Sequence, residues 1–153
     1  MKKFRIIQDC VNNMLKESKD KNEIMYGTLR LNGTCLFAKL LAQRRKLDVE
    51  LCAIAAMLYE YGIYKIKEEV NTRVCAAEVE RLMRVQGCFT REEIELVSKM
   101  ILNCRNYHEQ GDAYEELLKD ADILFRYLYI GSMEGVELYK SRIHKVLREL
   151  NIE

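Results

Sequence analysis

Apolar residues recur at helical spacing along most of the chain. A first stripe, whose members are three or four residues apart, predicts a helix over Phe4, Ile7, Val11 and Met14. A polar connector over residues 16–23 separates it from a second helix, expected from about residue 29 to residue 46. The apolar face of that second helix is predicted to consist of Leu29, Leu36, Phe37, Leu40 and Leu41.

Capping residues and glycines indicate where the next helices begin and end. Asp48 is a suitable N-cap for a third helix over residues 49–60, which is apolar on nearly every side and should therefore be central. A fourth helix is expected from near Asn71 to Gln86 and should stop before Gly87.

Two capping boxes predict two further helices. Thr90 with Glu93 opens a fifth helix, and Asp112 with Glu115 opens a sixth that reaches Gly131. The last helix is predicted to carry Val136, Tyr139, Ile143, Val146 and Leu150. Since no window alternates with a period of two, the sequence predicts an all-α fold, a single compact domain of about six to seven helices.

The composition is that of an ordinary globular domain. The 153 residues are 49% hydrophobic and 32% charged, and the net charge of +1 provides no field that attracts nucleic acid or anionic membrane. Six cysteines without a C-x-x-C pair indicate reduced thiols and a cytoplasmic protein. We therefore expect no nucleic-acid or membrane partner, while an unknown small ligand, a protein partner and a homodimer all stay open.

Three polar residues lie on apolar stripes of the predicted helices: Asn32, Glu60 and Asp122. A buried carboxylate without a partner costs several kcal/mol, so such groups are normally paired, protonated or bound to a ligand. Two alternatives need no ligand. Glu60 can reach solvent at the end of its helix, and Asp122 can pair with a nearby arginine.

The order of these residues resembles a known family. The segments LRLNGTCLFAKLLAQRRKLDVELCAIAAMLYEYG, NTRVCAAEVERLM, MILNC and ELLKDADILFRYL are similar to motifs of the HD superfamily, helical metal-dependent phosphohydrolases. The resemblance covers residues 26–130 and implies an HD-like helical core there. Residues 1–25 would then form an N-terminal helix and connector, and residues 131–153 a C-terminal helix packed on the core.

The chain departs from the family at the metal ligands. The family's first His, its His-Asp doublet and its last Asp correspond by position to Asn32, Tyr59 with Glu60, and Asp122. The further histidines that hold a second metal in some members correspond to Asn71 and Cys104. His108, one helical turn beyond Cys104, is a weaker candidate. Its position favours a solvent-exposed histidine over a metal ligand.

Without imidazole, the remaining donors are hard oxygen atoms. We therefore expect no cofactor and no resident metal; Glu60 and Asp122 would at best hold Mg²⁺ or Mn²⁺ weakly. Two carboxylates that face each other across one pocket should either share a proton, with Tyr59 or Tyr61 donating a hydrogen bond, or pair with an arginine that reaches in. The available arginines are Arg30, Arg73, Arg105 and Arg126.

The resemblance together with these departures implies a catalytically inactive HD-like domain with no catalytic residues. Its function would be that of a regulatory or binding module for a small phosphate-bearing ligand or a protein partner. The alternative is a Mg- or Mn-dependent phosphohydrolase with an atypical oxygen-donor site.

Overall fold

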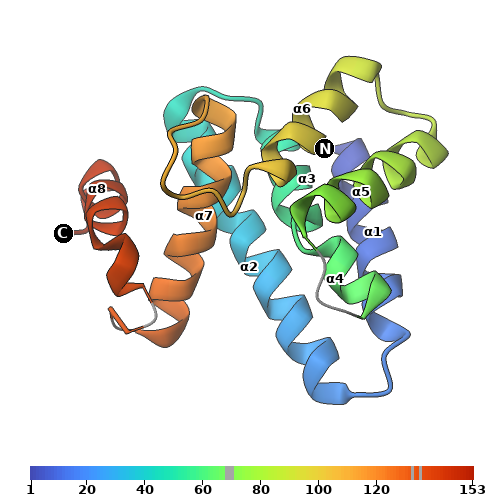
Figure 1. Cartoon of the computed structure of the whole chain (residues 1–153), viewed down its shortest axis with the longest axis horizontal. Helices are drawn as coiled ribbons and strands as arrows, with labels where there is room; N and C mark the ends of the chain where they lie inside the picture. Colours follow the sequence, from blue (N-terminus) through green and yellow to red (C-terminus); the bar gives the residue numbers. More distant parts are fainter. Residues whose placement is uncertain (68–70, 132, 135) are drawn as a thin grey trace.

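Helices form the regular structure of the computed structural model, which describes residues 1–67, 71–131, 133–134 and 136–153 (Figure 1). No strand occurs among those residues, so the predicted all-α class is confirmed. The elements are α1 (Lys2–Lys16), α2 (Lys21–Arg45), α3 (Val49–Leu58), α4 (Tyr61–Ile66), α5 (Thr72–Gln86), α6 (Arg91–Leu102), α7 (Ala113–Ile130), the 3₁₀ helix η1 (Glu137–Tyr139) and α8 (Lys140–Glu149).

The predicted capping residues occupy their expected positions. Asp48 and Asn71 each accept a hydrogen bond from the backbone three residues later, and both capping boxes are formed. Gly87 and Gly131 end α5 and α7 with φ angles of 67° and 76°, a left-handed conformation that glycine adopts without steric cost. Local sequence thus determines most helix boundaries.

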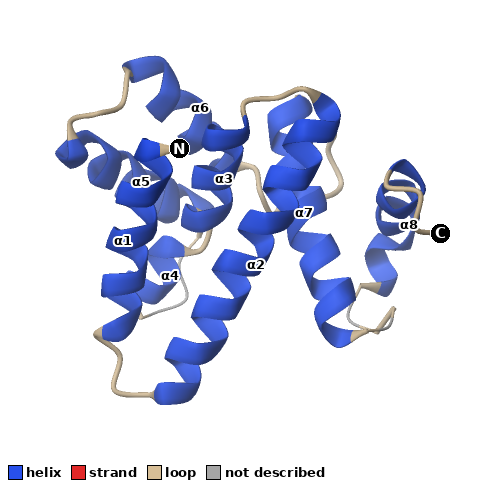
Figure 2. Ribbon diagram, turned by 180° about the vertical axis from the view of Figure 1, so that it is seen from behind, coloured by secondary structure: helices blue, strands red, loops and turns tan. Residues whose placement is uncertain are grey.

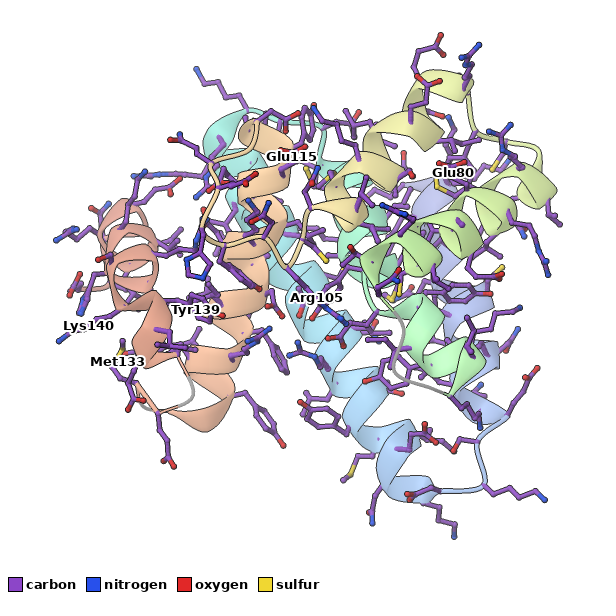
Figure 3. The ribbon with its side chains drawn as sticks, in the orientation of Figure 1. Glu80, Arg105, Glu115, Met133, Tyr139 and Lys140 are labelled. Carbon is purple, nitrogen blue, oxygen red and sulfur yellow. The ribbon has the colours of Figure 1, made fainter. Side chains whose placement is uncertain are left out.

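Helix α3 lies at the centre of the fold, in contact with α1, α2, α6 and α7. Every residue from Cys52 to Leu58 is fully buried, as its apolar sequence predicted. Helix α8 packs on α7 at one side of the molecule, and η1 leads into it at Tyr139 and Lys140 (Figures 1 and 3). Over the described ranges, no helix is long and apolar enough to cross a bilayer.

Helix α2 differs from its prediction in two ways. It begins at Lys21, because the Asp20 side chain accepts a hydrogen bond from the Asn22 amide and caps the first turn. Its buried face consists of Leu31, Cys35, Ala38, Leu41 and Ala42, whereas the expected stripe is largely exposed. The prediction was wrong for Leu29, Leu36 and Leu40, which are 46%, 64% and 46% exposed.

The physical reason lies in the size of the buried side chains. Cys35, Ala38 and Ala42 of α2 are short and buried, and α3, which α2 contacts, contains buried alanines, so the two helix backbones can approach closely. The larger leucines of α2 lie on another face. Periodicity alone does not distinguish two apolar faces of one helix.

Helix α3 ends two residues earlier than predicted. Tyr59 and Glu60 link α3 to the short helix α4, and Glu60 has φ −114° and ψ 10°, outside the helical range. This break directs Tyr59 into the core, where it is 4% exposed, and leaves Glu60 half-buried beside α2. The link is the part of the fold that forms the candidate site.

Candidate functional site

The guanidinium of Arg30 lies between the two carboxylates singled out in the sequence. Its Nε donates to Glu60 Oε2 at 2.8 Å, and its Nη2 donates to Glu60 Oε1 at 3.0 Å and to Asp122 Oδ1 at 2.8 Å. Arg30 is 7% exposed and Asp122 only 2%. Helices α2 and α7 and the α3–α4 link therefore meet at a buried ion cluster.

Both oxygens of the Asp122 carboxylate take part in hydrogen bonds or ion pairs. Oδ1 also receives the Tyr59 hydroxyl at 2.9 Å, and Oδ2 receives the Tyr107 hydroxyl and pairs with Arg126 Nη2 at 2.7 Å. A carboxylate has about four lone-pair positions. Arg30, Arg126 and the two phenols together use that capacity.

The surroundings keep both phenols protonated. Burial raises the pKa of Tyr59 well above its usual value, and the charges of Asp122 and Glu60 raise it further. Burial and then Asp122 likewise raise the pKa of Tyr107. Burial alone lowers the pKa of Arg30, but its anionic partners outweigh this and raise it. The cluster thus consists of charged arginines, carboxylates that accept hydrogen bonds, and neutral phenols.

A pocket of about 440 Å³ opens beside this cluster. It is lined by Tyr26, Arg30, Glu60, Ile63, Tyr64 and Arg126. The volume lies within the range of small-molecule sites, and tyrosine rings with a few polar groups are a typical lining. Arg126 has a side chain that is 33% exposed, so its guanidinium is the cation more accessible from solvent.

The sequence-derived candidates do not all come together. Tyr59, Glu60 and Asp122 meet through Arg30, one of the four arginines expected to reach in. Asn32 lies on another side of α2, where it accepts from Gln8 and donates to the Thr28 carbonyl, both at 2.9 Å.

The weaker candidates for the site are Asn71, Cys104 and His108, and none of them supplies a reactive group to the cluster. Asn71 is exposed and caps α5 through its contact with the Val74 amide. Cys104 is buried, which raises the pKa of its thiol to about 12 and leaves it protonated at neutral pH. His108 is exposed and lines a different cavity.

The donor set fits a transition-metal centre poorly. A metal between Glu60 and Asp122 would have to displace Arg30, which already supplies a charge and three hydrogen bonds there. In the part of the chain that the structure describes, no imidazole forms a hydrogen bond or ion pair with either carboxylate. Throughout the described ranges, no group of three or more His, Cys, Asp and Glu side chains is arranged to hold a metal.

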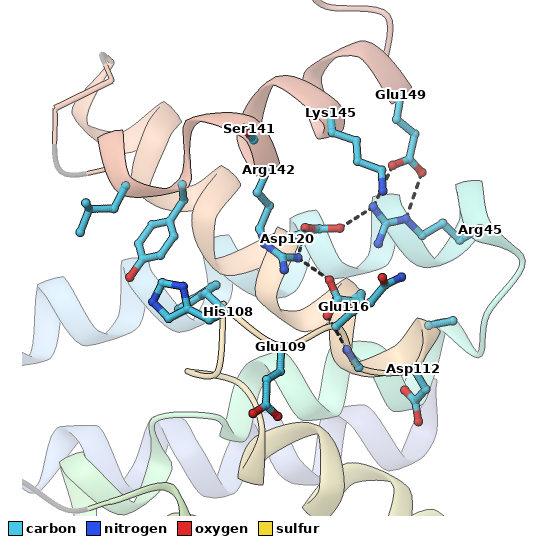
Figure 4. Close-up of a pocket in the computed structure, with 16 residues that line it drawn as sticks. Arg45, His108, Glu109, Asp112, Glu116, Asp120, Ser141, Arg142, Lys145 and Glu149 are labelled. Carbon is cyan, nitrogen blue, oxygen red and sulfur yellow. Dashed lines mark hydrogen bonds and ion pairs between the residues drawn. The ribbon is translucent and has the colours of Figure 1, made fainter.

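A larger cavity, of about 730 Å³, lies between α7, α8 and the loop before α7 (Figure 4). Two arginines of its lining pair with carboxylates of the same lining. Arg45 contacts Asp120 and Glu149, while Arg142 contacts Glu116 and Asp120, at 2.7–3.0 Å. These pairs fasten α8 to the remainder of the fold, and we interpret the cavity as a structural joint.

Two residues of the cluster had little or no signal in the sequence. Arg30 lies on the buried face of α2. Only the position of that face distinguishes it from the other arginines that were expected to reach the carboxylates. Tyr107 comes from the loop after α6, whose path local sequence does not predict. Comparison with family models, curated protein sequences and solved structures finds no match to this chain.

Proposed function

We propose that this chain is a catalytically inactive HD-like domain that functions as a regulatory or binding module, with the pocket beside Arg30 as its binding site. The observation that supports the proposal is the position of Arg30. An arginine held between Glu60 and Asp122 supplies the positive charge that a metal would otherwise provide to two buried carboxylates.

The pocket chemistry favours a small phosphate-bearing ligand over a protein segment. Arg126 offers a half-exposed guanidinium, and arginine is the preferred side chain for bidentate contacts with phosphate. Tyr26 and Tyr64 add ring faces on which a planar group can pack. A nucleotide combines both chemical features.

Ligand binding is tested by isothermal titration calorimetry with ADP, GDP, UDP and inorganic phosphate. We expect at least one nucleotide to bind, and Arg126→Met to weaken its binding at least about tenfold through loss of a charged contact. The matched control is Arg142→Met, which removes a half-buried arginine from the α7–α8 joint. Equal losses in both variants would contradict the assignment of the pocket.

Catalysis is tested separately with the same nucleotides in the presence of Mn²⁺ or Mg²⁺. We expect no hydrolysis above the buffer rate, because the carboxylates are engaged by arginines and phenols. Metal-dependent hydrolysis that Asp122→Ala abolishes would establish the phosphohydrolase alternative instead. A stoichiometric metal held by Glu60 and Asp122 would have the same consequence.

A further inference from the structure

Helix α2 carries apolar side chains on two opposite faces, of which only one is covered. Leu31, Ala38 and Ala42 pack into the core, whereas Met25, Leu29, Leu36 and Leu40 are 66%, 46%, 64% and 46% exposed. At 3.6 residues per turn these four fall on one line along the helix. Figure 2 shows α2 running between α1 and α7. We call this row, residues 25, 29, 36 and 40, the α2 stripe.

The residue spacing along the α2 stripe is the same from either end of the helix. From Asn22 the steps are three residues to Met25 and four to Leu29; from Gln43 they are three back to Leu40 and four to Leu36. Asn32 and Gly33 lie at the midpoint. The order of amide, apolar, apolar is therefore symmetric about the middle of the helix.

We propose that the α2 stripe docks a second copy of this chain, with the two α2 helices antiparallel across a two-fold axis near Asn32 and Gly33. In a two-fold interface, if residue i contacts residue j of the partner, j also contacts i. An antiparallel pairing about this midpoint places Leu29 against Leu36 of the other copy and Met25 against Leu40. In this arrangement every apolar residue of the α2 stripe meets another apolar residue of the same row.

The polar groups at the centre and ends of the α2 stripe do not oppose this contact. Asn32 already has hydrogen bonds to Gln8 and Thr28, so its burial leaves neither its oxygen nor its nitrogen without a partner. Asn22 and Gln43, both exposed, would face each other as neutral amides at either end. Lys39, on the flank, has its ammonium 3.9 Å from the centre of the Phe4 ring in the same protomer.

The exposed apolar area of the α2 stripe determines how tight a dimer we expect. The four side chains expose on the order of 400 Å² per copy, an apolar centre about half the size of the roughly 800 Å² that each partner buries in a stable complex. Neighbouring polar residues would supply the rim. We therefore expect a reversible dimer with a dissociation constant on the order of 10–100 µM.

Sedimentation velocity from about 1 to 500 µM, a range chosen to bracket this dissociation constant, tests the proposal on the full chain. Leu36→Glu should raise the dissociation constant at least about 100-fold, because each dimer would then bury two unpaired carboxylates. Val85→Glu is the matched control: it places the same charge at a 76% exposed position on α5 and should leave the constant within about twofold. Far-UV circular dichroism and thermal melting of each variant establish that it is folded.

A charge-paired double variant tests the antiparallel register. In the variant Leu29→Lys with Leu36→Glu, each lysine faces a glutamate of the other copy, so the constant should return to within about tenfold of the original. Leu29→Lys with Leu36→Lys should stay monomeric. A wild-type chain that is monomeric at every concentration overturns the proposal and leaves the α2 stripe to another kind of partner or to none. A dimer insensitive to Leu36→Glu, or a folded Leu29→Lys, Leu36→Glu variant that stays monomeric, also overturns it.

Discussion

Replacing Arg30 with methionine tests the central physical argument, because methionine keeps much of the side-chain volume and removes the charge. In the native protein the guanidinium makes three hydrogen bonds to two carboxylates, one of them 2% exposed. Asp122 would keep Tyr59, Tyr107 and Arg126, whereas Glu60 would lose both hydrogen bonds that it accepts from Arg30.

The expected loss in free energy of unfolding follows from the two carboxylates that Arg30→Met leaves without this arginine. Removing one partner of a buried ion pair typically costs about 3–5 kcal/mol, since the remaining charge stays desolvated. Here two carboxylates would share that deficit, so we expect a value within this range at pH 7.

Urea denaturation followed by circular dichroism at pH 7 measures this loss. The matched control is Arg91→Met, which breaks a solvent-exposed pair with Glu95 and should leave the free energy of unfolding nearly unchanged. Adding Glu60→Gln and Asp122→Asn to Arg30→Met should recover part of the loss, because the buried charges are then gone. The reasoning is refuted if Arg30→Met costs less than about 1 kcal/mol, or if the two neutral substitutions add further loss in full.

Three further substitutions have expected outcomes that follow from single contacts. Tyr59→Phe removes a buried hydroxyl that donates to Asp122 at 2.9 Å, and should lower the free energy of unfolding by about 1–3 kcal/mol in urea titrations. Gly62→Ala places a methyl group 2.9 Å from the Cys75 Cα, where backbone cannot yield easily, so the thermal midpoint should fall by several degrees, from about 1–3 kcal/mol of overpacking. Burial alone raises the pKa of Glu116, but a backbone amide and two cations lower it to about 2, so its contribution is present above about pH 4.5 and is lost as the pH falls towards 2. Glu116→Gln should therefore cost about 1–2 kcal/mol at pH 6 after allowance for solvent screening, and a constant difference between pH 6 and pH 3 would contradict this assignment.

Most of the helix boundaries could be predicted from the sequence. Asp48, Thr90 and Asp112 satisfy amide groups within three residues of themselves, and Gly87 and Gly131 provide left-handed ends. These interactions are local, so the sequence alone predicts them. The same holds for the burial of α3, whose apolar composition leaves few polar positions to face water.

The candidate site was only partly predictable. Glu60 and Asp122 were conspicuous because a carboxylate on an apolar stripe needs a partner. Which partner it has depends on the rotation of α2, and an α2 rotated to bury Leu29, Leu36 and Leu40 would direct Arg30 elsewhere. Asn32 was assigned to the pocket on that incorrect rotation, and it lies instead against Gln8 of α1.

By itself, the sequence determined that α1–α3 and α5–α8 are helices, most of their caps, the central position of α3 and the need for a partner at two carboxylates. Tertiary structure decided which of two apolar faces of α2 is buried, that Arg30 lies between Glu60 and Asp122, and that Tyr107 reaches the same cluster from a distant loop. The difference has a physical cause. Caps and periodicity act over a few residues, whereas the choice between two similar faces depends on the shapes of α3 and α7, which are far away in the chain but adjacent in the fold.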